Sequence, residues 1–277
     1  MGNGFDFEKI ANNIPLVTVI SAKWFFSKEL FPQDKPLPID PPGLGITWPG
    51  KSDATRVIEE ECELDIPDEP QRYFFAGRAD QNFGRLGGSG EFRGLVFAYN
   101  PSIEGSHTGS ATPFDTGDLW NRVIAPKLVH ESDVKKLIRK TTVPLEQWRK
   151  SFKGFLKAFF PNPRDYYDGR PRADADWEGP NNLPARDEKN AHFHAWTWEV
   201  RLHEEHPLLE GLLLWAAPRE THTELESYGS QPDLSSYWGD GPSWVERLQE
   251  AKHIDLGPIP DIQDLKVFED EIQKQLF

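Results

Sequence analysis

The amino-acid sequence predicts an α+β fold in which helices flank a mixed or antiparallel β-sheet. Two kinds of segment point to it: short runs rich in β-branched and aromatic residues, typical of strands, and longer runs with the periodicity of amphipathic helices. The two kinds do not alternate regularly along the chain, as they would in a doubly wound parallel sheet. We expect residues 1–277 to form a single domain, as mixed folds of this length often do.

Five segments are expected to be strands. They are residues 15–21, 71–79, 94–100, 191–202 and 208–217. The first, PLVTVIS, is rich in β-branched residues, which fit a pleated and half-buried surface. Segments 71–79 and 94–100 are expected to pair as a hairpin with a long connection that contains the glycine-rich turn 84–90. The last two strands are expected to be joined by a short polar turn around residues 205–207.

Six segments are expected to be helices. They are residues 22–31, 117–125, 132–140, 145–160, 243–252 and 265–276. The clearest is 145–160, where apolar residues recur at helical spacing and lysines occupy the other face. Its apolar positions are Trp148, Phe152, Phe155, Leu156, Phe159 and Phe160. Residues 32–49 and 161–190 are rich in proline and polar residues, so we expect loops there.

Composition excludes several classes of protein. The 10 tryptophans and 18 phenylalanines are enough to build a core, so disorder is not expected. The single cysteine, Cys62, cannot form an internal disulfide, which favours a reducing compartment and a cytoplasmic location. Residues Met1–Lys9 lack the basic and apolar regions of a signal peptide, and no stretch approaches the roughly 20 apolar residues of a membrane helix.

Charge is unevenly distributed along the chain. The net charge of −14 argues against general affinity for nucleic acid or anionic membranes. Residues Lys127–Lys157, called the basic segment below, nevertheless hold nine lysines and arginines against three acidic residues. This segment suits a polyanionic or acidic partner, or else it is a solvated helix face that matches acidic parts of the same chain.

The strand expected at 191–202 places a carboxylate in an unusual position. Alternation puts Trp198, Val200 and Leu202 on one face, and Thr197, Glu199 and Arg201 on the other. A mid-strand carboxylate is costly to bury unless it is paired or functional. Two interpretations follow: Thr197, Glu199 and Arg201 form an exposed sheet face, or Glu199 belongs to an active site.

Two histidines just upstream raise the alternative of a metal site. The pattern His192-x-His194 followed by Glu199 is similar to the first metal motif of cupins, and imidazole and carboxylate groups suit zinc, iron or nickel. In an unbroken strand, however, Glu199 faces away from both histidines, and the glycines that flank the cupin motif are missing. We therefore expect no bound metal, and a structural or substrate-contacting role for both histidines.

Several short motifs resemble those of ADP-ribosyltransferases, including the DNA-targeting toxins. The runs WTWEVRL and PLLEGLLLWAAP look like the family's late strand pair, with Glu199 at the catalytic glutamate. YFFAGRAD ends a strand with Arg78, similar to the arginine that anchors NAD, and GSATPFDTG contains Ser110 and Thr112, similar to the Ser-Thr-Ser motif. The order of the three motifs is the family's. The sequence departs from the pattern at Pro113, where the last serine would follow, and at Thr197, where the family has Glu or Gln.

This resemblance implies a split-sheet, NAD-dependent mono-ADP-ribosyltransferase. In it Glu199 would act at the nicotinamide ribose, Arg78 would bind phosphate, and Ser110 and Thr112 would lie beside the ribose. Aromatic residues would stack on the nicotinamide; the candidates are Tyr73, Phe74, Trp196 and Trp198.

The resemblance also implies a domain plan and a biological role. Residues 117–160 would be a helical insertion and 161–190 a loop. The enzyme would be a toxin or defence effector that modifies an intracellular nucleic acid or protein, with the basic segment facing that acceptor and an inhibitory partner controlling it. The alternatives left open are a cupin-like metalloprotein and a non-catalytic interaction protein.

Overall fold

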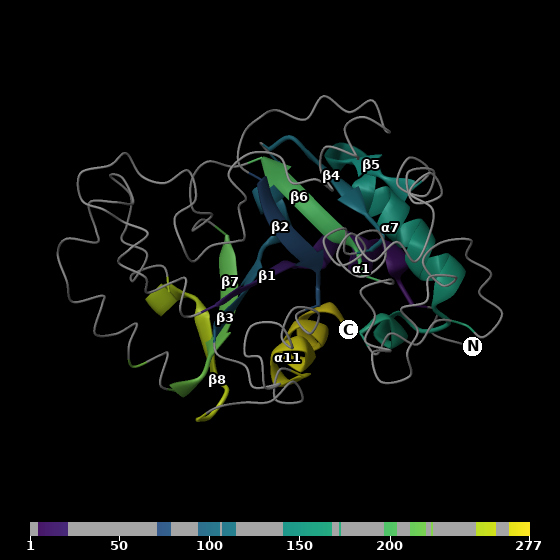
Figure 1. Cartoon of the computed structure of the whole chain (residues 1–277). Helices are drawn as coiled ribbons and strands as arrows, with labels where there is room; N and C mark the ends of the chain where they lie inside the picture. The colour runs from purple at the N-terminus through teal and green to yellow at the C-terminus, as the bar shows by residue number, and fades with distance from the viewer. Residues whose placement is uncertain are drawn as a thin grey trace, which may run out of the picture.

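The computed structural model describes residues 5–21, 71–78, 94–105, 107–114, 141–167, 172, 197–203, 211–219, 223, 248–258 and 266–277. These residues form a mixed α and β structure in which helices lie beside an eight-stranded sheet (Figure 1). None of the described helices is both long and apolar enough to cross a membrane.

The sheet runs in the order β5-β4-β6-β2-β1-β3-β7-β8. Its strands are β1 (Leu16–Ser21), β2 (Gln71–Ala76), β3 (Gly94–Tyr99), β4 (Gly109–Thr112), β5 (Val143–Pro144), β6 (Glu199–His203), β7 (Leu212–Ala217) and β8 (Lys252–Asp255). Among these described strands all neighbours pair antiparallel except β7 and β8, which are parallel. The expectation of a mixed sheet is therefore confirmed.

The described helices lie between and after these strands. They are α1 (Phe7–Asn13), α7 (Leu145–Phe159), α11 (Lys266–Leu276) and the 3-10 turns η3 (Pro101–Glu104) and η5 (Pro163–Tyr166). α1 begins where the Asp6 side chain accepts a hydrogen bond from the Lys9 backbone N–H at 2.9 Å. α7 carries Glu146 in its first turn and Lys157 in its last, an order that suits the helix dipole.

One face of the sheet packs against α7, and we call it the α7 face. Trp198 on this face lies among the α7 aromatics, with its ring centroid 6.3 Å from that of Trp148 and 6.0 Å from that of Phe152. Further along the same face, Phe74 of β2 meets Tyr99 of β3 edge to face at 5.7 Å. Figure 1 shows α7 alongside β4 and β6. The helical periodicity of the sequence thus predicted correctly which side of α7 is buried.

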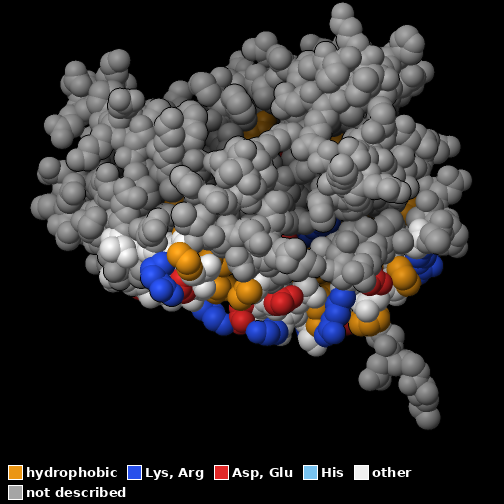
Figure 2. Space-filling view, turned by 60° about the horizontal axis from the view of Figure 1, so that its bottom comes forward, with side chains coloured by type: hydrophobic (Ala, Val, Ile, Leu, Met, Phe, Trp, Pro, Cys, Tyr) orange, Lys and Arg blue, Asp and Glu red, His pale blue; other side chains and the backbone are white. Residues whose placement is uncertain are grey.

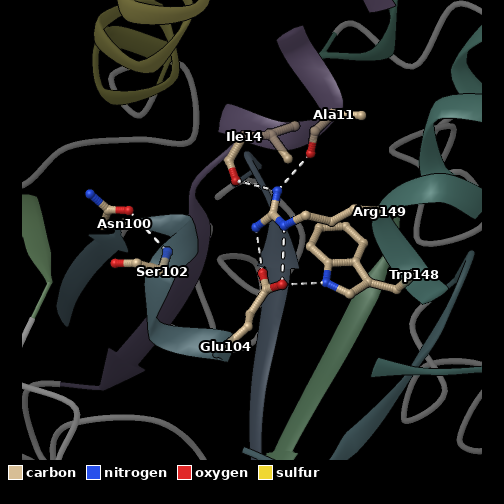
Figure 3. Close-up of polar contacts among 7 residues, drawn as sticks. All are labelled: Ala11, Ile14, Asn100, Ser102, Glu104, Trp148 and Arg149. Carbon is tan, nitrogen blue, oxygen red and sulfur yellow. Dashed lines mark hydrogen bonds and ion pairs between the residues drawn. The ribbon is translucent and has the colours of Figure 1, made fainter. Parts of the chain in front are cut away.

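A polar network ties α7 to the N-terminal helix (Figure 3). The Arg149 guanidinium pairs with Glu104 of η3 and donates to the backbone carbonyls of Ala11 at 2.6 Å and Ile14 at 3.3 Å. The Trp148 indole N–H donates to the same Glu104 carboxylate at 2.8 Å. The network satisfies carbonyls at the C-terminal end of α1 and joins three separate elements, so its role is structural.

Two strand pairings expected from the sequence are wrong. β2 and β3 do not form a hairpin, because β1 lies between them and pairs with both. β6 and β7 are not neighbours either: β6 pairs with β2 and β4, whereas β7 pairs with β3 and β8. The described side chains of the N-terminal strand β1, Leu16 to Val19, are buried on both faces, as a central strand requires.

The remaining sequence expectations have mixed outcomes. The strands expected at 15–21, 71–79, 94–100 and 208–217 and the helices at 145–160 and 265–276 are confirmed with small shifts of their ends. Lys252, expected to end a helix, instead begins β8. Several expected features lie outside the described residues. They are residues 22–31, 32–49, 84–90, 117–125, 132–140 and 205–207, most of 161–190, and Cys62, His192, His194 and Trp196.

Candidate active site

The face opposite α7 carries two cross-strand rows of residues on β4, β6 and β2. In the first row Glu199 lies between Thr112 of β4 and Phe75 of β2. In the second row Arg201 lies between Ser110 of β4 and Tyr73 of β2. Side chains directly opposite one another on one face of an antiparallel pair are close enough to interact. We call Ser110, Thr112, Thr197, Glu199 and Arg201 the β6 polar cluster.

The cluster is buried. Glu199 is 1% exposed and Arg201 0%, and Thr197, Ser110 and Thr112 are covered to a similar degree. The interpretation of Thr197, Glu199 and Arg201 as an exposed sheet face is therefore wrong. Alternation along the strand was correctly inferred, but it does not tell whether the second face is covered.

Arg201 connects the two rows by hydrogen bonds. Its Nη1 donates to Glu199 Oε1 at 2.9 Å, and its Nε donates to the hydroxyl oxygen of Ser110 at 3.1 Å. The Thr112 hydroxyl donates to the backbone carbonyl of Phe114 at 3.0 Å. A buried carboxylate is tolerated because an opposite charge and further hydrogen bonds accompany it.

This arrangement holds a carboxylate, paired with a guanidinium, at a defined place in the buried interior. Electrostatic interactions are stronger there than in water, and a fixed carboxylate can stabilise positive charge that develops in a transition state. The Ser110 hydroxyl, which accepts from Arg201, can donate its proton to a polar substrate, and the Thr112 hydroxyl, whose proton goes to Phe114, can accept a hydrogen bond from one. Four residues proposed from the sequence thus share one face of three adjacent strands; they are Tyr73, Ser110, Thr112 and Glu199.

Trp198 does not lie with them. It precedes Glu199 and therefore points to the α7 face, where its side chain is buried among Trp148, Phe152 and Phe155. The structure thus separates this candidate stacking residue from Glu199 by the thickness of the sheet. Phe74 lies on the α7 face for the same reason, which leaves half-buried Tyr73 as the described aromatic candidate on the face of Glu199.

Arg78 is also separated from the cluster. It follows Gly77, whose φ of 64° ends the extended path of β2. The Arg78 guanidinium then lies over the Tyr166 ring, 5.5 Å from its centroid, and the side chain is 1% exposed. Tyr166 packs on Phe152 of α7, so Arg78 lies with the residues of the α7 face.

Two of the described cations of the basic segment are engaged within the chain. Arg149 belongs to the Glu104 network, and Lys153 pairs with Glu8 of α1. Lys150 and Lys157 are exposed, and the segment before residue 141 lies outside the described residues. In Figure 2 acidic and basic side chains lie next to one another on the described part of the surface. Within the described residues, then, part of the basic segment matches acidic groups of the same chain.

No group of three or more histidine, cysteine or acidic residues within the described part of the chain is arranged to hold a metal ion.

The sequence reasoning missed Arg201 as a member of the site. Its spacing of two residues from Glu199 already placed both side chains on one face, and that was the available signal. The contact with Ser110, 91 residues earlier in the chain, was not readable from the sequence.

Comparison of the chain with protein-family models, with curated proteins and with solved structures finds no match. The functional assignment therefore depends on the residues of the site.

Proposed function

We propose that this protein is an NAD-dependent enzyme similar to mono-ADP-ribosyltransferases, with Glu199 as its catalytic residue. One observation carries the proposal: two motifs far apart in the sequence, Ser110-x-Thr112 and Glu199, meet on one face of the adjacent strands β4 and β6. Thr112 lies directly opposite Glu199, and Ser110 lies in the next row, opposite Arg201, so both hydroxyl residues are on the strand beside the carboxylate.

In the proposed reaction the bond between the ribose C1′ and the nicotinamide nitrogen breaks. The bonding electron pair leaves with nicotinamide, and positive charge develops at C1′ and the ring oxygen. The acceptor then attacks C1′ and loses a proton. Glu199 would accept a hydrogen bond from a ribose hydroxyl and stabilise the developing charge, while Ser110 and Thr112 would bind the same ribose.

Two features of the fold shape this proposal. Arg78 lies on the α7 face, so the proposal does not assign the NAD phosphates to it. The Glu199 side chain is 2% exposed, so NAD reaches it only after the covering part of the chain moves. Binding that requires such a change is slower than the usual encounter of a ligand with an open site.

The proposed acceptor is an intracellular nucleic acid or protein, met by the basic segment. Such an activity fits a cytoplasmic toxin or defence effector controlled by an inhibitory partner.

The test is incubation of the chain with NAD and a cell lysate containing nucleic acid, followed by mass analysis for ADP-ribose adducts and free nicotinamide. Glu199→Gln should lower turnover by about 10²–10³-fold, the size typical of losing a key electrostatic group at a developing charge. Glu104→Gln is the matched control, because Glu104 also pairs with an arginine but belongs to the structural network of Figure 3.

Glu104→Gln should keep its turnover at temperatures where it is folded. The proposal is contradicted if the wild-type chain does not consume NAD, or if Glu199→Gln turns NAD over at nearly the wild-type rate.

A further inference from the structure

Arg201 is among the most deeply buried charged side chains that the structure describes. Its large side chain is 1% exposed and lies on the face of the sheet that carries Glu199. Its planar guanidinium directs two donors at fixed angles, one to the carboxylate of Glu199 and one to the hydroxyl of Ser110. A single residue therefore contacts two of the groups assigned to the proposed reaction.

The ion pair differs from an ordinary structural one in what it connects. Arg149 and Glu104 belong to different elements, so their pair tethers α7 to η3. Arg201 and Glu199 belong to the same strand and are two residues apart, so their ion pair joins no separate elements. Buried ion pairs also contribute little net stability relative to apolar residues of the same shape. The contact that Arg201 makes with a neighbouring strand is instead its hydrogen bond to Ser110 of β4, so the ion pair itself mainly fixes the Glu199 carboxylate relative to Arg201.

We infer that Arg201 is a positioning residue that holds the Glu199 carboxylate and the Ser110 hydroxyl in the geometry required for the reaction. This inference rests on the proposed function. The hydrogen bond from Nη1 fixes Oε1, and the guanidinium supplies the opposite charge that a buried carboxylate needs. The bond from Nε fixes the neighbouring hydroxyl oxygen. Arg201 acts through these two side chains and does not itself contact NAD.

A double-mutant cycle tests this role. Wild type, Arg201→Gln, Glu199→Gln and the double variant are compared for kcat and KM in NAD hydrolysis, at a temperature where circular dichroism shows each to be folded. Arg201→Gln should lower kcat about 10–100-fold, the size of effect seen when a residue that orients a functional side chain is removed. It should leave KM for NAD nearly unchanged, because the substrate contacts themselves remain. In the Glu199→Gln background, Arg201→Gln should cost a smaller factor than it costs in the wild type, because only the contact with Ser110 is left for it to remove.

Two further variants separate positioning from folding. Arg201→Lys keeps the charge but loses the fixed fork, so it should fold and have a kcat between those of wild type and Arg201→Gln. Arg149→Gln is the matched control: it breaks the Glu104 network and should lower the melting temperature without lowering kcat.

Three results overturn the inference. Effects that multiply in the double variant would show that Arg201 acts independently of Glu199. A raised KM with unchanged kcat would make Arg201 a substrate-binding residue. A wild-type kcat in folded Arg201→Lys or Arg201→Gln would show that Arg201 has no role in the reaction. A wild-type chain that leaves NAD unchanged overturns the proposed function itself, and the role of Arg201 with it, so the two failures are distinguishable.

Discussion

Trp148 and Trp198 pack against each other in the core, with ring centroids 6.3 Å apart, but only one of their indole N–H groups is satisfied. Trp148 donates to Glu104 at 2.8 Å. The Trp198 Nε1 is buried and has no hydrogen-bond partner among the described residues. The two rings therefore contribute similar apolar surface but differ in their polar atoms.

Replacing each tryptophan with phenylalanine should separate these contributions. Trp148→Phe should lose more free energy of unfolding than Trp198→Phe, by about 1–3 kcal/mol, because only Trp148→Phe breaks a hydrogen bond to a charged group. Urea unfolding of both variants measures the difference. Trp198→Phe should also leave NAD turnover unchanged, because its ring lies on the α7 face. Equal losses of stability in the two variants would contradict the finding that the Trp148 N–H is hydrogen-bonded and the Trp198 N–H is not.

Two glycines should respond to alanine in opposite directions. Gly154 is exposed in the middle of α7, and an added Cβ would meet nothing within 4 Å, so Gly154→Ala should stabilise the protein by about 0.5–1 kcal/mol. A Cβ on Gly109 would lie 2.0 Å from the backbone oxygen of Arg201, so Gly109→Ala should destabilise by about 1–3 kcal/mol. Thermal unfolding checks both. A stable Gly109→Ala variant would show that β4 does not approach β6 this closely.

Tyr167 should make the protein sensitive to alkali. Burial raises the pKa of its hydroxyl well above the usual value of about 10, and nearby Tyr166 and Glu269 add to the effect. A raised pKa in the folded state means that the neutral phenol contributes stability below about pH 10, and that this contribution is lost as the pH rises toward the folded-state pKa. The urea concentration at the unfolding midpoint should therefore fall between about pH 8 and about pH 10.5, and this fall should be larger for wild type than for Tyr167→Phe.

The same variant has a second expected effect at neutral pH. The Tyr167 hydroxyl has no hydrogen-bond partner among the described residues, so Tyr167→Phe should be neutral or slightly stabilising there. If the urea midpoint falls by the same amount at high pH in wild type and in Tyr167→Phe, the alkaline sensitivity belongs to other groups.

The acceptor proposed for the basic segment is tested at Lys150 and Lys157, the two exposed lysines of α7. If the acceptor is a DNA duplex, replacing both with glutamine should weaken binding and reduce the dependence of log affinity on log salt by about 0.9 for each phosphate that is no longer neutralised. NAD hydrolysis without acceptor should stay unchanged. Lys153→Gln is the control, because Lys153 already pairs with Glu8. A salt dependence that does not change would show that these lysines only solvate the helix.

Local periodicity was sufficient for several features of this protein. The alternation of Trp198, Glu199, Val200 and Arg201 determined which side chains share a face, because successive strand residues point to opposite sides. The helical spacing of apolar residues in α7 determined its buried side in the same way. Both patterns depend only on residues close together in the chain, so the sequence alone was enough.

Only the tertiary structure decided the strand neighbours and the burial of the second face. The central place of β1 and the meeting of Ser110 with Arg201 depend on contacts between distant segments, which local patterns do not encode. Glu199 was compatible with solvent as well as with a site until the structure showed the face to be covered. Arg78 was separated from Glu199 by the turn at Gly77 and by the position of Tyr166, 88 residues further along the chain. Pairing and burial are properties of the whole fold, since each is set by which distant segments offer complementary surfaces.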